Sequence, residues 1–200
     1  MQGRDPVEAP HIFEAVKAQF SEAVVATDDT VKSPFITIAA PWLLQVMQFL
    51  RDEPTLRFDM LLIVTGVDYP DSIASVYHLT SIGLKHHVAV KVHLPREQPE
   101  VDSVSALWPA ADWHERETFD MMGIVYKGHP NLRRILCPED WEGYPLRKDY
   151  QQPEEYHGIS NVRQIGDDFY PKPDEDSKAV QGWKPPKAPP APAAPKAEKV

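Results

Sequence analysis

The sequence predicts an α+β domain in which an antiparallel β meander packs against helices, followed by a long irregular C-terminal segment. Three apolar, β-rich runs joined by short turn-like connections predict consecutive antiparallel strands. Two amphipathic patterns near the N-terminus predict helices that cover the apolar face of this sheet. After residue 123 the periodicity ends, and glycine, proline and charged residues predominate.

The two early helices are predicted over residues 11–20 and 41–51. Their apolar residues recur with helical spacing, namely Ile12, Phe13, Val16 and Phe20 in the first and Leu43, Val46, Met47 and Leu50 in the second. Pro41 suits the first position of a helix, where its missing N–H is not needed. Residues 23–26 form a short apolar piece, and residues 35–39 are typical of a strand.

The meander is predicted over residues 60–69, 73–80 and 88–94. Residues 70–72 have turn chemistry, and residues 81–85 make a short connection. In the last strand, four apolar residues alternate with His87, Ala89, Lys91 and His93, so the two sets face opposite sides of the sheet.

A third helix is predicted over residues 113–122. Asp112 is expected to cap its N-terminus, and Glu115, three residues later, has the spacing of a capping box. Gly123 suits the position just beyond the C-terminus. The same prediction pairs Arg116 with Asp112 or Asp120, four residues away on either side.

Composition excludes several classes of function. The formal net charge of −9 gives no electrostatic support to nucleic-acid binding or to attraction by an anionic membrane. The best apolar run, residues 60–64, is far shorter than the roughly 20 residues that span a bilayer. The N-terminus resembles neither a signal peptide nor a transit peptide. Any membrane connection is therefore expected to be indirect, through a partner protein.

Motifs for cofactor binding and catalysis are missing from the sequence. Cys137 is the only cysteine, and one thiol cannot hold an iron–sulfur cluster or a structural zinc; we expect it to act as a small apolar residue. No Gly-rich nucleotide loop and no nucleophile motif is present. One rival interpretation remains open, a free-standing hydrolase or lyase that uses His114, Glu117 and Asp120.

Charged and aromatic residues are dense between residues 115 and 150. Arginine and aromatic side chains together are typical of protein interfaces, although a solvated surface has a similar composition. The candidate partner-interface residues are Glu115, Arg116, Glu117, Asp120, His129, Arg133, Arg134, Trp141, Arg147, Lys148, Asp149 and Tyr150.

The same stretch carries a family resemblance. Residues 115–150 read ERETFDMMGIVYKGHPNLRRILCPEDWEGYPLRKDY, which closely resembles the signature of the 30-kDa subunit of respiratory complex I, the bacterial NADH:quinone oxidoreductase. The departures are small: Tyr144 stands where histidine is expected, Met122 where phenylalanine is common, and Cys137 where leucine is common.

The resemblance implies a structural role in a respiratory enzyme. Complex I passes electrons from NADH through FMN and iron–sulfur clusters to a quinone and couples this to ion translocation. Its 30-kDa subunit binds no cofactor, sits in the hydrophilic arm with the other subunits there, and packs on the 49-kDa quinone-site subunit near the terminal-cluster subunit. For this chain the resemblance therefore implies a non-catalytic, peripheral subunit at the cytoplasmic face of the cell (inner) membrane.

Three parts of the chain follow from these patterns: an α+β core domain (1–123), an irregular partner-binding segment (124–150), and an extended tail that is acidic and then Pro/Ala/Lys-rich (151–200). We expect Arg133, Arg134 and Arg147 to meet carboxylates of the large partner. Two alternatives stay open. The chain could be the equivalent subunit of a membrane-bound hydrogenase or a ferredoxin-dependent dehydrogenase, or a binding module whose residues 181–200 dock a polyproline receptor.

Overall fold

The computed structural model describes residues 8–161, which fall into two compact units with the boundary between residues 152 and 153. The helices and strands of the first unit are α1 (Ala9–Gln19), β1 (Val24–Asp28), β2 (Phe35–Ile38), the 3-10 helix η1 (Ala40–Trp42), α2 (Leu43–Asp52), β3 (Met60–Asp68), β4 (Ser72–Ser81), β5 (His86–Pro95), β6 (Glu100–Asp102), α3 (Ala111–Met122) and β7 (Val125–Lys127). The described part of the second unit is a hairpin of β8 (Glu155–Tyr156) and β9 (Ile159–Ser160).

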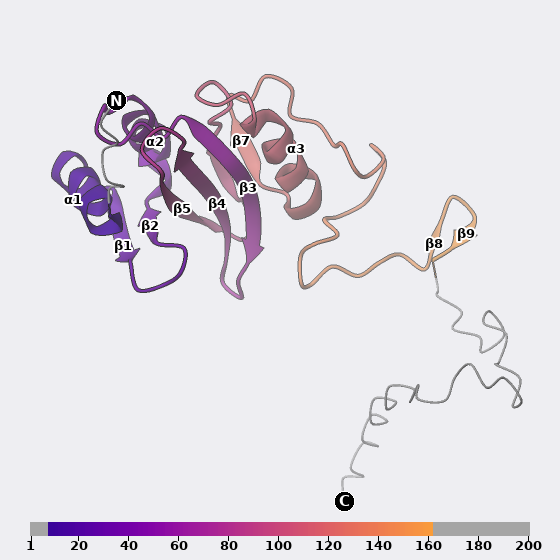
Figure 1. The fold of residues 1–200 in the computed structure, drawn as a ribbon. Helices are drawn as coiled ribbons and strands as arrows, with labels where there is room; N and C mark the ends of the chain where they lie inside the picture. The colour runs from indigo at the N-terminus through magenta and orange to yellow at the C-terminus, as the bar shows by residue number, and fades with distance from the viewer. Residues whose placement is uncertain (1–7, 162–200) are drawn as a thin grey trace, which may run out of the picture. The chain divides into compact units, whose positions relative to one another are not determined.

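The main sheet has five strands in the order β1-β2-β5-β4-β3 (Figure 1). β3, β4 and β5 form the predicted antiparallel meander, and β4 pairs with β5 along its whole length. β2 runs parallel to β5, because the chain crosses the sheet through α2 before it enters β3 at the far edge. The predicted α+β class is confirmed, and the sheet is mixed rather than wholly antiparallel.

One face of the sheet builds the core with the helices. The alternation predicted for β5 is observed: Val88, Val90, Val92 and Leu94 are buried in the main core. The core also contains the apolar faces of α1 and α2, namely Ile12, Phe13, Val16, Leu43, Val46, Met47 and Leu50. Burial of these side chains supplies most of the driving force for folding, at about 25 cal/mol per Å² of apolar surface.

α3 lies against β3, where a glycine allows close approach. A Cβ on Gly66 would lie 2.8 Å from Met122 Cγ and 3.3 Å from Thr118 Cγ2, so a larger residue would push the helix away from the strand. This packing fixes the position of α3, whose polar side chains build the site described below.

One prediction about the region around α3 is wrong. The helix begins at Ala111, and no side chain caps it, because Asp112 lies within the first turn and Glu115 is engaged elsewhere. The segment after Gly123 is irregular apart from β7, whose parallel pairing with β6 the sequence did not reveal. The C-terminal end is as predicted: Gly123 has φ 74°.

Among residues 8–161, no helix combines the length and the apolar character needed to cross a bilayer. Of the predicted tail (151–200), residues 162–200 lie outside the described residues, and so does the predicted polyproline docking segment 181–200.

A polar network around α3 as the candidate interface

Asp120 holds the loop of residues 134–137 onto α3. Its side chain is fully buried, and Oδ2 accepts the backbone N–H groups of Ile135 (2.9 Å), Leu136 (2.6 Å) and Cys137 (2.9 Å). Oδ1 accepts Arg134 Nη1 at 2.9 Å. Desolvation raises the pKa of Asp120, but these four donors outweigh it, so the pKa lies below its usual value. One carboxylate thereby orders three successive peptide groups.

Two arginines of the signature close the C-terminal end of α3. Arg134 Nη1 donates to the Asp120 carbonyl at 3.2 Å, and Arg147 Nε donates to the Met122 carbonyl at 2.8 Å. Terminal carbonyls of a helix lack intrahelical partners and carry partial negative charge, which favours cations there. The guanidinium carbons of both arginines also lie over the Tyr144 ring, at 5.5 Å and 4.6 Å from its centroid.

Asp68 anchors the end of the signature on the sheet. This residue is buried at the end of β3. Its carboxylate accepts hydrogen bonds from both Nη groups of Arg96 and, at 2.7 Å, from the Lys148 N–H. Arg96 Nη2 also pairs with Asp149 Oδ1 at 2.9 Å. The hydrogen bonds from Arg96 are the main reason that the pKa of Asp68 lies below its usual value. Sequence analysis missed both Asp68 and Arg96.

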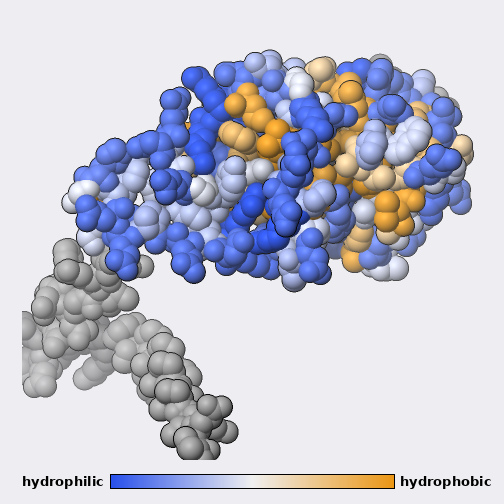
Figure 2. Space-filling view, turned by 180° about the vertical axis from the view of Figure 1, so that it is seen from behind, coloured by the Kyte–Doolittle hydropathy of each residue, from blue (hydrophilic) through white to orange (hydrophobic). Residues whose placement is uncertain are grey.

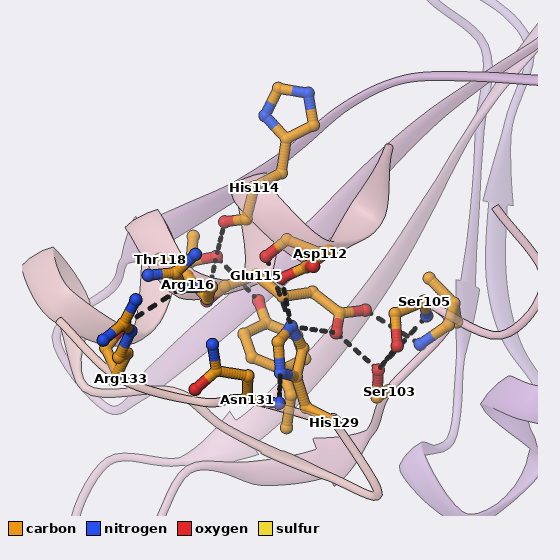
Figure 3. A network of polar contacts seen from close by, with 12 residues as sticks. Ser103, Ser105, Asp112, His114, Glu115, Arg116, Thr118, His129, Asn131 and Arg133 are labelled. Atoms are coloured by element: carbon orange, nitrogen blue, oxygen red, sulfur yellow. Dashed lines mark hydrogen bonds and ion pairs between the residues drawn. The ribbon is translucent and has the colours of Figure 1, made fainter. Parts of the chain in front are cut away.

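Glu115 is fully buried at the other side of α3 (Figure 3). Its Oε2 accepts the Ser103 hydroxyl at 2.6 Å, and its Oε1 accepts the Val104 N–H at 2.8 Å. Desolvation raises the pKa of Glu115 to about 7, and the two hydrogen bonds only partly oppose this rise. Glu115 is therefore a link between α3 and the turn after β6, rather than the capping residue that was predicted.

His129 joins the same network with a defined tautomer. The Asn131 N–H donates to Nδ1 at 3.0 Å, so Nδ1 is an acceptor and the proton resides on Nε2. Nε2 lies 3.2 Å from both the carbonyl and Oδ1 of Asp112, and 4.0 Å from Glu115 Oε2. The His129 ring thus connects the loop after β7 to the first turn of α3.

Arg116 is the third buried charged residue of α3, with 6% of its surface exposed. It pairs with neither Asp112 nor Asp120, contrary to the predicted i±4 pairs: Asp120 is bound by Arg134, and Asp112 Oδ1 lies 3.2 Å from His129 Nε2. Its Nε lies 3.4 Å from the Arg133 carbonyl, and its guanidinium carbon lies 4.8 Å from the Trp113 ring centroid.

A buried hydroxyl network ties α3 to the sheet. Tyr126 of β7 donates to Thr118 Oγ1 at 3.1 Å and lies 3.0 Å from Ser75 Oγ of β4. Burial raises the pKa of the Tyr126 phenol, so the group stays protonated and can donate. Thr118 in turn donates to the His114 carbonyl at 2.5 Å.

The remaining predicted interface residues lie toward the surface. Glu117, Arg133, Lys148 and Asp149 are exposed, and Trp141 and Tyr150 are half-buried. Three apolar side chains that the prediction did not include are also exposed: Trp113 at 63%, Leu136 at 61% and Leu146 at 61%. Figure 2 shows hydrophobic areas interrupted by hydrophilic residues on one face of the molecule.

The hydrolase or lyase interpretation finds no assembled site in the described chain. The His114 side chain points away from the network in Figure 3, Glu117 is exposed, and Asp120 is fully engaged by Arg134 and three N–H groups. Within residues 8–161, no three His, Cys, Asp or Glu side chains gather closely enough to hold a metal ion. Cys137 is a half-buried free thiol whose pKa is raised, chiefly by desolvation.

The sequence also did not reveal the hydroxyl groups of the network, which belong to Ser75, Ser103, Thr118 and Tyr126. Their partners are 8 to 51 residues away along the chain, so no local pattern marks them. The signal that was available is chemical: an acidic residue at the end of an apolar strand, such as Asp68, needs a partner when it is buried.

Comparison with known proteins identifies the family. Residues 36–156 match the family described as "Respiratory-chain NADH dehydrogenase, 30 Kd subunit". The chain is 44% identical over 161 residues to the C subunit of the NADH-quinone oxidoreductase of Chloroherpeton thalassium, covering 79% of this chain and 67% of that relative. It is 45% identical over 152 residues to the corresponding protein of Chlorobium phaeobacteroides, covering 74% and 91%.

Solved structures agree with this. A trypsin-resistant fragment of Nqo5 is 25% identical with a TM-score of 0.54, covering 63% of this chain and all of the fragment. A chain of the membrane-bound sulfane sulfur reductase, an archaeal respiratory membrane complex, shares the fold with a TM-score of 0.62 at 23% identity, covering 72% of this chain and 86% of that one. The protein therefore belongs to the family of the 30-kDa subunit of NADH-quinone oxidoreductase.

Proposed function

We propose that the chain is a non-catalytic structural subunit of the hydrophilic arm of an ion-translocating NADH:quinone oxidoreductase. It docks the large, 49-kDa quinone-site subunit and lies near the terminal-cluster subunit, and by holding them it supports electron transfer from NADH to quinone. The family membership and the names of the relatives, which are the corresponding subunits of NADH-quinone oxidoreductases, support this assignment.

One structural observation carries the docking proposal. Residues 134–149 form no helix or strand, yet two buried carboxylates and a helix carbonyl accept hydrogen bonds from their backbone. The bonds to Asp120 and the Met121 carbonyl hold the peptide groups of Leu136 and Leu146, while the side chains of both leucines stay exposed. A rigid loop that presents apolar side chains outward is preorganised for a protein partner, since little entropy is lost on binding.

The redox chemistry belongs to other subunits in this proposal. FMN and the iron–sulfur clusters reside in partner chains, because this sequence carries one cysteine and no nucleotide-binding loop. The chain is a peripheral subunit at the cytoplasmic face of the cell membrane, and it reaches the membrane only through its partners.

The test is affinity purification of the tagged full chain from detergent-solubilised membranes, with the recovered subunits identified by mass spectrometry. We expect the large quinone-site subunit, iron–sulfur subunits and a flavin-binding subunit. Leu146→Glu should reduce their recovery at least about tenfold, because a charge would be buried at the interface. Val25→Glu is the matched control, since Val25 is 67% exposed on β1, away from the signature.

Two outcomes would contradict the proposal. Recovery of the chain alone would contradict the structural role and would favour the free-standing hydrolase or lyase that uses His114. Recovery of a nickel-binding subunit in place of flavin- and NADH-binding subunits would support the hydrogenase alternative instead.

A further inference from the structure

Arg116 stands out among the cations near the signature segment because it is a buried residue and no carboxylate pairs with it in the part of the chain that the structure describes. The neighbouring arginines are satisfied within the chain: Arg134 by Asp120, Arg147 by the Met122 carbonyl, and Arg96 by Asp68 and Asp149. Arg116 has one long hydrogen bond to the Arg133 carbonyl, from Nε, and a contact with the face of Trp113. Among residues 8–161, its Nη1 and Nη2 atoms donate no hydrogen bond.

Neither aspartate on the same helix forms an ion pair with it. Asp112 Oδ1 lies against His129 Nε2, and both oxygens of Asp120 are occupied by Arg134 and backbone N–H groups. Glu117, the next residue along α3, is exposed and makes no ion pair with Arg116. Arg116, with only 6% of its residue surface exposed, is thus left without an ion-pair partner among the described residues.

The surroundings of Arg116 resemble an open receptor. Trp113 covers the guanidinium with one face and is itself 63% exposed, so its ring is free to be covered by a partner. The exposed Arg133 lies at the same end of the network, opposite Ser103 and Ser105 (Figure 3). An exposed aromatic ring beside two arginines is the composition of an interface hot spot.

The chemistry of Arg116 selects the occupant. A largely buried residue whose charge has no ion-pair partner is costly, and a carboxylate that neutralises it gains charge-assisted hydrogen bonds from the Nη groups. The planar guanidinium fork matches a carboxylate in two parallel bonds. A protein carboxylate fits better than a lipid phosphate, because the net charge of −9 opposes approach to an anionic membrane.

From this geometry we infer that Arg116 is a receptor for an Asp or Glu carboxylate of a neighbouring protein subunit, which seats between the Trp113 ring and Arg133. The inference rests on the proposed function and gives it a specific contact: the internally paired Arg134 and Arg147 shape the loop, and Arg116 recognises the partner. The site should be filled only in the assembled complex.

The first test separates recognition from folding. Arg116→Met keeps the length and packing of the side chain but removes the charge. The melting temperature of the isolated full chain should stay the same or rise, because an unpaired buried charge is lost. Recovery of the large subunits from membranes should fall at least about tenfold. A lower melting temperature together with normal recovery of the subunits would mean a structural role and would overturn the inference.

The second test identifies the carboxylate directly and does not depend on the stability of the Met variant. The amine introduced by Arg116→Lys is treated with a zero-length carbodiimide in the assembled complex, and cross-linked peptides are sequenced. We expect a bond to an Asp or Glu of a neighbouring subunit, absent from the unsubstituted complex. Lys85→Arg with the same treatment is the matched control for reactive surface amines, since Lys85 lies in the turn between β4 and β5.

Three results would overturn the inference. These are an assembled complex without this cross-link, a cross-link only to Glu117, or a cross-link only to acidic residues of this chain's own 162–200 segment. The proposed function fails separately, if the unsubstituted chain recovers no neighbouring subunit at all. In that case the inference about Arg116 fails as well. Loss of the Arg116 contact alone contradicts only that inference and leaves the proposed docking role intact.

Discussion

The sheet region and the signature segment are ordered by different forces. Strands β3 to β5 and helices α1 and α2 are fixed by apolar side chains that leave water, such as Leu50 and Val90. Residues 134–149 are fixed mainly through their backbone, which donates to Asp120 and Asp68, and through arginines that bind helix carbonyls. The signature therefore needs few apolar side chains of its own to hold its shape.

This difference has a functional consequence. A loop that folds by burying its apolar side chains cannot also present them to a partner. A loop that is held by its peptide groups can keep Leu136 and Leu146 exposed and still be rigid. Such a loop is sensitive to substitution of a single residue. Each buried carboxylate accepts hydrogen bonds from several donors, so its loss leaves several groups unsatisfied at once.

The largest effect is expected for Asp120→Ala. The substitution leaves three backbone N–H groups and the Arg134 guanidinium without their acceptor, which costs about 3–5 kcal/mol by analogy with broken buried pairs. The opening should be local. Hydrogen exchange of the full chain should show faster exchange at residues 135–137, with the amides of β4 and β5 almost unchanged.

Leu50→Ala is the matched control for the other region. It removes a fully buried apolar side chain and should cost about 2–5 kcal/mol, measured by urea denaturation, with faster exchange across the sheet. If Asp120→Ala raised the hydrogen-exchange rates of β4 and β5 as much as those of residues 135–137, the two regions would not be stabilised independently.

A smaller effect, up to about 3 kcal/mol, is expected from the pH dependence that Glu115 adds. Its pKa is raised from 4.5 to about 7 by desolvation, so the folded state binds the proton more tightly than the unfolded state. Its contribution to the free energy of unfolding is therefore full below about pH 4.5 and is lost as the pH rises through about 7. The pKa values of Asp68 and Asp120 are lowered, so their contributions to the free energy of unfolding are lost only as the pH falls into the acidic range.

Glu115→Gln tests this linkage, because an amide mimics the protonated carboxyl and can keep contacts to Ser103 and Val104. The variant should match the unsubstituted chain near pH 5 and exceed its stability near pH 8, by urea denaturation at each pH. Identical pH profiles for the two chains would show that Glu115 is ionised in the folded state throughout this range.

The secondary structure was predictable where the forces are local. Helical spacing identified the core residues of α1 and α2, such as Val16 and Leu50, and alternation identified the inward face of β5. The parallel pairing of β2 with β5 and of β6 with β7 was not predictable, because it depends on how distant segments meet. Local spacing also gave a wrong N-cap at Asp112, since the helix begins at Ala111 and Asp112 lies within its first turn.

The candidate site was predictable in composition but not in pairing. The charge density of the signature marked Asp120, Arg134 and Arg147, yet it could not tell whether their partners lie in this chain or in another. The structure pairs these three with groups of the chain itself and leaves Arg116 without a carboxylate partner among the described residues. The prediction that the signature meets a large partner subunit stays a prediction.

The smallest effect is expected where the two regions join, at Gly123. This residue ends α3 with φ 74°, and a Cβ there would lie 2.6 Å from the Tyr144 ring and 2.7 Å from Arg147 Nη2. Gly123→Ala should cost about 1–2 kcal/mol for the left-handed backbone, and the clash should displace Tyr144 and Arg147 from the helix end. Gly83→Ala is the control, because a Cβ at Gly83 meets nothing within 4 Å. Hydrogen exchange should quicken at residues 144–147 in the Gly123 variant alone. If instead the protection of residues 144–147 stayed intact while β3 loosened, the helix end would be held by its packing on the sheet and not by the polar contacts of the signature.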